Sequence, residues 1–245
     1  MPSLEPYGKK LDYSYCLGSY PCKLLLENRP ESALRLLLSA DAQGEGVEAL
    51  RKRCVELGVR EETAQKVLRR ESGKDNCFAA IVFKKFQSAL KEDAPHAVFC
   101  QISDLGNLGT AMRSAVGFGY RDIALVRPCA DVFDPHVLRA SMGAFFLLRV
   151  HVYERFSDYL SEFPSRAMYP FMLDGARPLD EVAIKAPRAH SLIFGNEAAG
   201  LPAEFADYGQ SVKIPQSDSI DSLNLAVAAS VAMYTFNAKT KQFEK

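Results

Sequence analysis

Residues 191–202 read Ser-Leu-Ile-Phe-Gly-Asn-Glu-Ala-Ala-Gly-Leu-Pro. This stretch holds a short apolar run, then a turn bracketed by Gly195 and Gly200, and then Pro202, which suits the first position of a helix. A buried strand that leads through a loop into a helix is typical of a parallel α/β sheet. Ligands of such sheets bind outside the carboxyl ends of the strands. The stretch therefore predicts both a fold class and the place of a site.

The same alternation of apolar runs and helical segments continues over the chain beyond Pro95. Strands are expected at 97–102, 122–126, 146–152, 168–173, 191–194 and 211–214. Helices are expected at 108–118, 135–141, 157–163, 202–207 and 222–236. We therefore expect residues 95–245 to form an α/β domain, with a parallel sheet that carries helices on both faces.

Residues 1–94 have a different pattern and are expected to form a smaller α+β domain that ends in a linker. Leu34, Leu37 and Leu38 follow helical spacing, a second helix is expected to end at Gly58, and a third is expected over 61–70. Residues 77–83 are expected to form a strand, and residues 91–95 (KEDAP) a linker.

The composition of the 245-residue chain excludes several classes of protein. Apolar residues make up 48% and charged residues 24%, as in globular proteins, and the apolar runs are too short to cross a bilayer. The first residues, MPSLEP, lack the pattern of a secretory signal, so we expect a cytoplasmic protein. The cysteines and histidines lack metal-ligand spacing, so we expect reduced thiols and no metal site.

Charge alone does not indicate a nucleic-acid partner, because thirty basic and thirty acidic residues give a net charge of zero. Basic residues nevertheless cluster at 51–53 and at 66–70. These clusters fit either a surface that faces phosphates or ordinary solvated helix faces interleaved with Glu.

A second loop, residues 104–113, reads DLGNLGTAMR. Asn107 is a good candidate for the N-cap of the following helix, and Arg113 lies in the second turn of that helix, off its expected buried stripe. A cation near a helix N-terminus opposes the helix dipole and is stabilised by an anion. That anion is either a substrate phosphate or a carboxylate of Asp104 or Asp131.

A third loop, residues 214–224, reads IPQSDSIDSLN. Pro215 ends a strand, and Ser222 is expected to be the N-cap of the final helix. Asn224 is either a site residue or a solvated polar residue of the first turn. Glu197 lies in the turn between Gly195 and Gly200. It either faces a ligand or accepts backbone N–H groups that hold the loop.

The three loops together resemble the motifs of the SpoU (TrmH) family of SPOUT methyltransferases. The matches are Asn-x-Gly-x-x-x-Arg at 107–113, Gly-x-Glu-x-x-Gly-Leu at 195–201, Ile-Pro at 214–215 and Ser-Leu-Asn at 222–224. The resemblance covers roughly residues 97–236. Residues 10–92 only loosely resemble the small ribosomal-protein-like domain with which many members bind RNA. In two positions of the third loop the chain departs from the family pattern, with Gln216 and Asp218 where Met and Gly are common.

The resemblance implies a deep trefoil knot near the C-terminus, a homodimer, and S-adenosylmethionine as the cofactor. It implies methylation of a ribose 2′-hydroxyl in ribosomal or transfer RNA, with residues 1–94 as the RNA-recognition domain. The residues implied as catalytic are Arg113, Asn107, Glu197, Ser222 and Asn224, and those implied as cofactor-binding are Gly195, Ile214 and Leu223.

Two other functions are considered beside this one. A catalytically inactive, RNA-binding ribosome-assembly factor of the same fold would keep the fold without the reaction. A doubly wound enzyme of conventional topology would use a nucleotide cofactor, but the chain lacks both a Gly-x-Gly-x-x-Gly loop and a Walker A lysine.

Overall fold

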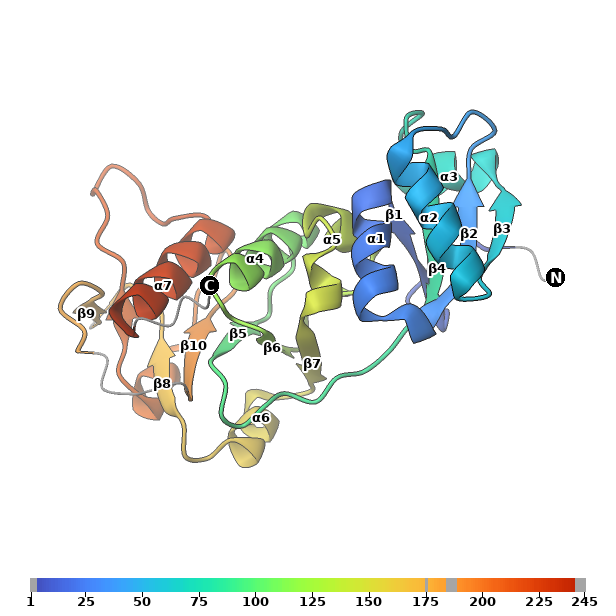
Figure 1. Ribbon diagram of the computed structural model, residues 1–245. Coiled ribbons are helices and arrows are strands. Elements are labelled where there is room, and N and C mark those ends of the chain that lie inside the picture. The colour runs from blue at the N-terminus through green and yellow to red at the C-terminus, as the bar shows by residue number, and fades with distance from the viewer. Residues whose placement is uncertain (1–3, 175, 184–188, 241–245) are drawn as a thin grey trace. The chain divides into compact units, whose positions relative to one another are not determined.

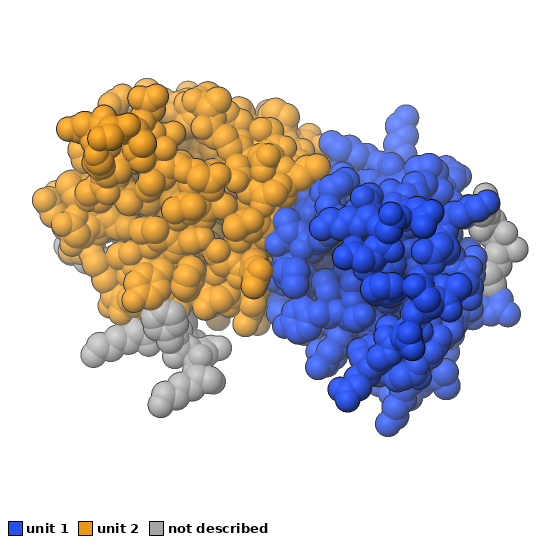
Figure 2. All heavy atoms as spheres, turned by 90° about the horizontal axis from the view of Figure 1, so that it is seen from above, with its two compact units in different colours: residues 1–86, 131–147 blue, residues 87–130, 148–245 orange. Residues whose placement is uncertain are grey.

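The computed structural model describes residues 4–174, 176–183 and 189–240. The chain divides into two compact units, which are described separately here (Figure 1, Figure 2). Unit 1 comprises residues 1–86 and 131–147, and unit 2 comprises residues 87–130 and 148–245. The segment 131–147 thus groups with unit 1, although it lies within the second of the two domains expected from the sequence.

Unit 2 is built on a five-stranded sheet in which every pair of neighbouring strands is parallel, which confirms the predicted fold class. The strand order is β7-β6-β5-β10-β8. The strands are β5 (His96–Cys100), β6 (Asp122–Val126), β7 (Arg149–Tyr153), β8 (Ala167–Pro170) and β10 (His190–Phe194). Because β10 inserts between β5 and β8, the loops that follow β5 and β10 emerge next to each other.

Helices cover both faces of this sheet (Figure 1). On one face, α4 (Leu105–Gly117) packs against α7 (Leu225–Thr240), and Phe236 of α7 contacts Tyr169 and His190 of the sheet. On the other face, α6 (Phe156–Glu162) and the 3-10 helix η3 (Ala203–Tyr208) contribute Tyr159 and Phe205 to the core. The small residues of α7, including the fully buried Ala229 and Ala232, allow α4 to approach closely, as expected.

Short elements beyond the sheet complete unit 2. The parallel strands β9 (Arg177–Pro178) and β11 (Val212–Lys213) form a separate pair, and Phe171 bridges to Val212. The strand predicted at 211–214 is therefore confirmed in a shorter form, and the segment predicted as a helix at 202–207 forms the 3-10 helix η3. No described helix is long and apolar enough to span a membrane.

Unit 1 is an α+β structure around a four-stranded sheet of order β1-β4-β2-β3. Its strands are β1 (Tyr13–Leu17), β2 (Ala33–Leu38), β3 (Arg60–Thr63) and β4 (Ala79–Lys84). Its helical elements are α1 (Ser19–Asn28), η1 (Pro30–Ser32), α2 (Glu45–Glu56), α3 (Gln65–Ser72), α5 (Pro135–Ala140) and η2 (Ala144–Leu147). Strand β4 is antiparallel to both β1 and β2, whereas β2 and β3 are parallel.

Two helix predictions in unit 1 are wrong. The leucines of residues 34–38 lie in strand β2, where Leu36, Leu37 and Leu38 are all buried. A short run of consecutive apolar residues fits a buried strand as well as a helix, so the spacing of the leucines does not distinguish the two. The helix predicted at 61–70 begins only at Gln65, because residues 60–63 form the exposed strand β3. The helix that ends near Gly58 and the strand near 77–83 are confirmed.

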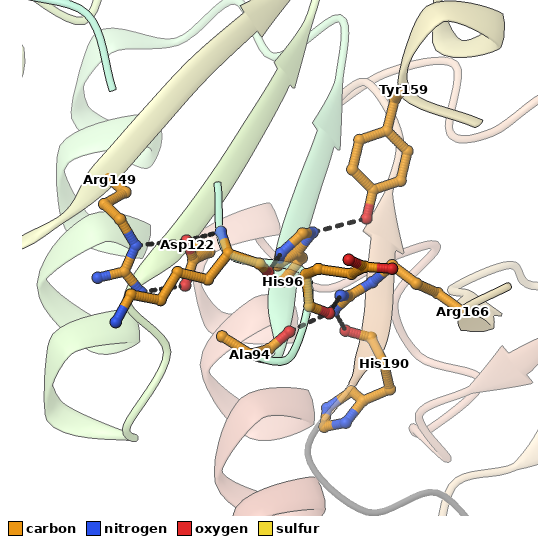
Figure 3. Close-up of polar contacts among 9 residues, drawn as sticks. Ala94, His96, Asp122, Arg149, Tyr159, Arg166 and His190 are labelled. Carbon is orange, nitrogen blue, oxygen red and sulfur yellow. Dashed lines mark hydrogen bonds and ion pairs between the residues drawn. The ribbon is translucent and has the colours of Figure 1, made fainter. Parts of the chain in front are cut away.

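A buried polar network lies at the amino ends of the strands of unit 2, away from the loops of interest (Figure 3). Its centre is the Arg166 guanidinium, which donates to Ser191 Oγ (3.0 Å), the Glu92 carbonyl (2.5 Å), the His190 carbonyl (2.6 Å) and the Ala94 carbonyl. This one side chain therefore fixes the chain that enters β5 to the starts of β8 and β10.

His96 and Tyr159 complete the same network. His96 Nδ1 lies 2.9 Å from Tyr159 Oη, and Tyr159 Oη lies 2.6 Å from Ser191 Oγ. Burial and the nearby charge of Arg166 lower the pKa of His96 to about 4. The imidazole is therefore neutral at pH 7, so it adds no second positive charge beside the Arg166 guanidinium.

Replacing Arg166 with Met tests the importance of this network for stability. We expect Arg166→Met to lower the free energy of unfolding by about 2–4 kcal/mol, because Ser191 and three backbone carbonyl oxygens, two of them in part-buried bonds, lose their charged donor. The matched control is Arg127→Met, since Arg127 is 54% exposed and pairs with an exposed Glu154. Surface pairs of that kind contribute about 0–1 kcal/mol. Equal losses in the two variants, measured by urea denaturation, would contradict this assignment.

Candidate active site

A cavity of about 540 Å³ opens beside the carboxyl ends of β8 and β10. Its lining residues come from five segments, within 171–174, 194–201, 203–206, 212–216 and 222–228. Gly195, Ile214 and Leu223, which the motif resemblance implies for the cofactor, all line it, and so do Glu197 and Ser222. The volume lies in the range of pockets that bind small molecules, about 300–1,000 Å³.

The wall formed by residues 195–201 depends on close backbone contact. A Cβ atom on Gly195 would lie 2.1 Å from the carbonyl carbon of Gly200, so only glycine fits this position. Gly200 has a φ of +68°, which also favours glycine. The backbones of Asn196 and Gly200 exchange two hydrogen bonds, of 3.2 and 3.0 Å. The loop therefore presents a backbone surface to the cavity, with little side chain on it.

Glu197 joins this loop to the start of α4. Its carboxylate accepts the backbone N–H of Ser103 (3.3 Å) and of Asp104 (3.0 Å), the Ser103 hydroxyl (3.2 Å) and the Asn107 side-chain amide (3.4 Å). Burial by itself raises the pKa of Glu197, but hydrogen bonds from backbone N–H groups and from Asn107 outweigh burial and lower that pKa. The side chain is thus a stable anion that holds two loops together.

Asn107 and Asn224 connect the third loop to the same junction. The Asn224 side-chain N–H donates to Asn107 Oδ1 over 2.9 Å. Asn224 Oδ1 in turn accepts the backbone N–H of Ala226 (3.0 Å) and of Val227 (3.3 Å) at the start of α7. A continuous set of hydrogen bonds therefore runs from Glu197 through Asn107 to Asn224, and the three loops meet there.

Both predicted N-caps are wrong in position. Asp104 caps α4, because its Oδ1 accepts the Asn107 backbone N–H, and the Asn107 side chain is engaged by Glu197 and Asn224 instead. Asn224 caps α7, which begins at Leu225, so Ser222 precedes the cap and lines the cavity. In both loops two suitable cap residues lie two or three positions apart, and tertiary contacts decide between them.

Arg113 lies on the exposed side of α4. Among the residues that the structure describes, it makes no ion pair and no hydrogen bond, and it does not line the cavity. The alternative that Asp104 neutralises it is not supported, since Asp104 is engaged in capping the helix. Arg113 follows Asn107 by six residues, or about 9 Å along a helix.

The departures from the family pattern alter the third loop without straining it. The Gln216 side-chain amide donates to the carbonyls of Ile220 (3.4 Å) and Asp221 (3.2 Å), which closes the turn between them. Gln216 also lines the cavity. Asp218 is not among the residues with positive φ, so its position does not require glycine here. The altered cavity edge is therefore formed by Gln216.

Several cavity residues were not anticipated from the sequence. The segment 171–174, with Phe171 and Asp174, forms one wall, and Lys213 belongs to another. Asn196 contacts the end of β5, as described below. No motif signal marked these positions, because their role depends on strand order. Within the described residues, no three His, Cys, Asp or Glu side chains are placed to hold a metal ion.

Comparison with known proteins places this site in a family. The model of the SpoU rRNA Methylase family matches residues 94–234, which include all three loops. The chain belongs to the SpoU rRNA Methylase family. The five-stranded parallel sheet of unit 2 agrees with the SPOUT fold of this family.

Two curated relatives illustrate the range of the family. The chain is 33% identical over 167 residues to an uncharacterized tRNA/rRNA methyltransferase of Synechocystis sp., covering 65% of this chain and 59% of that protein. It is 32% identical over 136 residues to the 23S rRNA (guanosine(2553)-2′-O)-methyltransferase of Bacillus subtilis, covering 54% of each. The chain thus spans between half and three fifths of the length of these relatives.

Solved SpoU structures match nearly the whole chain. An AdoMet-bound rRNA methyltransferase from Sinorhizobium meliloti is 25% identical, with a TM-score of 0.79 over 93% of this chain and 87% of that chain. The SpoU methyltransferase AviRb from Streptomyces viridochromogenes is 20% identical, with a TM-score of 0.80 over 94% and 90% of the two chains. The likeness to AviRb shows the shared fold.

The Glu197 junction can be tested through stability and its pH dependence. We expect Glu197→Gln to lower the free energy of unfolding by about 1–2 kcal/mol at pH 7, because several N–H donors lose a charged acceptor. The folded pKa of Glu197 is lowered, so its contribution is complete above the unfolded value of about 4.3 and is lost as the pH falls through the folded pKa.

The difference between wild type and Glu197→Gln should therefore shrink as the pH is lowered from 7 to 3. Glu204→Gln is the control, because Glu204 is exposed in η3 of the same unit. A difference that stays constant with pH would show that the carboxylate charge does not hold the loops together.

Proposed function

We propose that this chain transfers a methyl group from S-adenosylmethionine to a ribose 2′-hydroxyl of ribosomal or transfer RNA. The observation that carries the proposal is the cavity in which Gly195, Ile214 and Leu223 meet beside the Glu197 junction. The Sinorhizobium neighbour contains bound AdoMet, and the Bacillus relative is named as a 2′-O-methyltransferase of 23S rRNA.

The residues present fit this cofactor. The wall at 195–201 is flat backbone next to small side chains, which suits a planar base, and Phe194 and Leu201 add apolar surface. Lys213 and Asp174 supply opposite charges among the lining residues, which suits a ligand with an ammonium and a carboxylate group. Bound there, the cofactor supplies an activated methyl group on a sulfonium.

Arg113 is proposed as the residue that acts on the RNA. A guanidinium stays protonated, so Arg113 does not serve as a general base. It is suited to bind the phosphate next to the target ribose with two hydrogen bonds and to stabilise negative charge on the 2′-oxygen. In this arrangement Arg113 would hold the 2′-oxygen in place for the methyl group that the cofactor would supply, and the hydroxyl would release its proton to solvent.

Asn107, Ser222 and Asn224 are proposed to orient the ribose and the cofactor. Glu197 is proposed to act through the loops that it joins, because a carboxylate of lowered pKa that accepts several N–H groups is a poor base. These roles rest on positioning, which contributes much of the rate when the nucleophile and the methyl donor are held in line.

A homodimer is proposed as the active form. Val227, Val231 and Tyr234 lie on one face of α7, at helical spacing, and are 49%, 37% and 53% exposed. Tyr234 also contacts Phe118 at the end of α4, with ring centroids 5.6 Å apart. A second copy would bury this apolar face, and it would provide a site for Arg113, which does not line the cavity of its own chain. We also propose a cytoplasmic location, where relatives that act on ribosomal RNA would find their substrate.

Methyl transfer to RNA tests the function directly. Purified protein with S-adenosylmethionine labelled in the methyl group should label ribosomal or transfer RNA at a ribose 2′-oxygen. Arg113→Ala should lower the rate by at least about 100-fold, because the charge on the oxygen loses its stabiliser. Its cofactor affinity, measured by calorimetry, should stay within about threefold of wild type, since Arg113 does not line the cavity.

The control variant for that experiment is Arg155→Ala, which removes another exposed arginine of unit 2. Full activity of Arg113→Ala would refute the assignment of Arg113. Absence of cofactor binding by the wild type would favour the alternative, a catalytically inactive RNA-binding assembly factor.

Unit 1 is proposed to bind RNA, but most of its clustered arginines already have partners. Ion pairs engage Arg51 with Glu48 and Glu61, Arg53 with Glu56, Arg69 with Asp75, and Arg70 with Glu71. These pairs support the solvated-face interpretation for the arginines. Lys52 and Lys66 make no ion pair within the described residues, so they are the better candidates for phosphate contacts.

The salt dependence of RNA binding distinguishes these interpretations. Each lysine that contacts a phosphate should contribute about 0.7–0.9 to the slope of log affinity against log salt. The double variant Lys52→Gln/Lys66→Gln should therefore flatten the slope by about 1.4–1.8, whereas Arg53→Gln should leave it unchanged. An unchanged slope in the double variant would assign the whole cluster to solvated helix faces.

A further inference from the structure

Asn196 makes side-chain contacts to two different parts of unit 2, although no function has been assigned to it so far. It lies between Gly195 and Glu197, at an unspecified position of the Gly-x-Glu motif. Both ends of its side-chain amide are used, and each end serves a different segment. The amide oxygen and the amide nitrogen therefore have different partners.

The oxygen of the amide closes the loop on itself. Asn196 Oδ1 accepts the backbone N–H of Ala198 over 2.9 Å and of Ala199 over 3.1 Å. Asparagine commonly stabilises turns in this way. This half of the side chain shapes the backbone wall of the cavity and makes no contact outside its own loop.

The nitrogen of the amide reaches the neighbouring strand and the carboxylate. Asn196 Nδ2 donates to the Gln101 carbonyl (2.9 Å) and to Glu197 Oε2 (3.3 Å). Gln101 follows β5 directly and has a φ of +60°, a left-handed conformation that non-glycine residues rarely adopt. That conformation is held by contacts on both sides, since the Gln101 N–H also donates to the Val126 carbonyl over 3.0 Å.

We propose that Asn196 is a positioning residue, which sets the spacing between the cavity loop and the β5–α4 junction and orients the Glu197 carboxylate toward it. The inference deepens the proposed methyl-transfer function and rests on it for its catalytic consequence. Through Glu197, Asn196 determines where Asn107 lies, and Asn107 in turn holds Asn224, which lies between the cavity residues Leu223 and Leu225.

The rival explanation is that Asn196 only closes its own turn. Asn196→Asp separates the two explanations, because aspartate keeps the acceptor for Ala198 and Ala199 and loses both donors of the nitrogen. It also places a second carboxylate next to Glu197, and like charges at that distance repel. Asn196→Ala removes both halves. The ionisable groups around this position are Glu197 on the same loop, Asp104 at the start of α4, and Asp174 and Lys213 among the cavity residues.

Hydrogen exchange of individual amides, followed by NMR, tests the positioning directly. In Asn196→Asp, the amides of Ser103 and Asp104 should exchange about tenfold faster, while those of Ala198 and Ala199 keep their wild-type rates. In Asn196→Ala, all four amides should exchange faster. The control is Asn76→Asp, which introduces the same charge in an exposed turn of unit 1 and should change none of them.

Steady-state kinetics provide the second measurement. Asn196→Asp should lower kcat at least about tenfold, because a small misplacement of the positioned groups costs that much or more. The dissociation constant for S-adenosylmethionine should stay within about threefold, because the loop wall is intact. Wild-type kcat together with unchanged exchange at Ser103 and Asp104 would overturn the proposal and leave Asn196 as a turn cap.

The two measurements also separate this inference from the proposed function. If the wild type transferred no methyl group to RNA, the proposed function would fail. The exchange of the Ser103 and Asp104 amides would still decide whether Asn196 positions the Glu197 carboxylate.

Discussion

The site depends on one interaction, in which the Glu197 carboxylate accepts N–H groups of Ser103 and Asp104 from a loop more than ninety residues earlier in the chain. Each of these hydrogen bonds is charge-assisted, and such bonds are stronger than neutral ones. Together with the hydrogen bond from Asn196 to the Gln101 carbonyl, they join the loop after β10 to the loop after β5 beyond the sheet itself. The Glu197 carboxylate is thereby linked to the cavity wall, to the start of α4 and, through Asn107, to the cap of α7.

The parallel sheet makes the interaction possible, because it brings the carboxyl ends of β5 and β10 to the same edge. At the amino ends of the strands, Arg166 holds the chain that enters β5. The two ends of the strands are therefore held by different polar groups. The close approach at Gly195 leaves the cavity lined by backbone. Arg113 stays exposed on α4, and within the described residues it makes no ion pair.

Much of this arrangement was predictable from sequence, for physical reasons that can be named. Strand–loop–helix patterns identify the carboxyl-end loops, and glycine spacing marks where backbone must approach backbone. The N-caps were not predictable, because Asp104 and Asn107 are equally good caps and only the contact with Glu197 decides between them. Strand β2 was missed because a short leucine run fits either structure. The link from Asn196 to Gln101 joins residues 95 positions apart, and no local pattern encodes it.

We propose that the loops at 195–201 and 214–224 form one cavity for the methyl donor, joined to the start of α4 by Glu197. Titration of the isotopically labelled protein with S-adenosylmethionine, followed by amide chemical shifts, tests it most directly. We expect saturable shifts concentrated at 195–201 and 214–225, with smaller ones at Ser103 and Asp104. Shifts concentrated in the strands of unit 1, or no saturable shift at all, would contradict it.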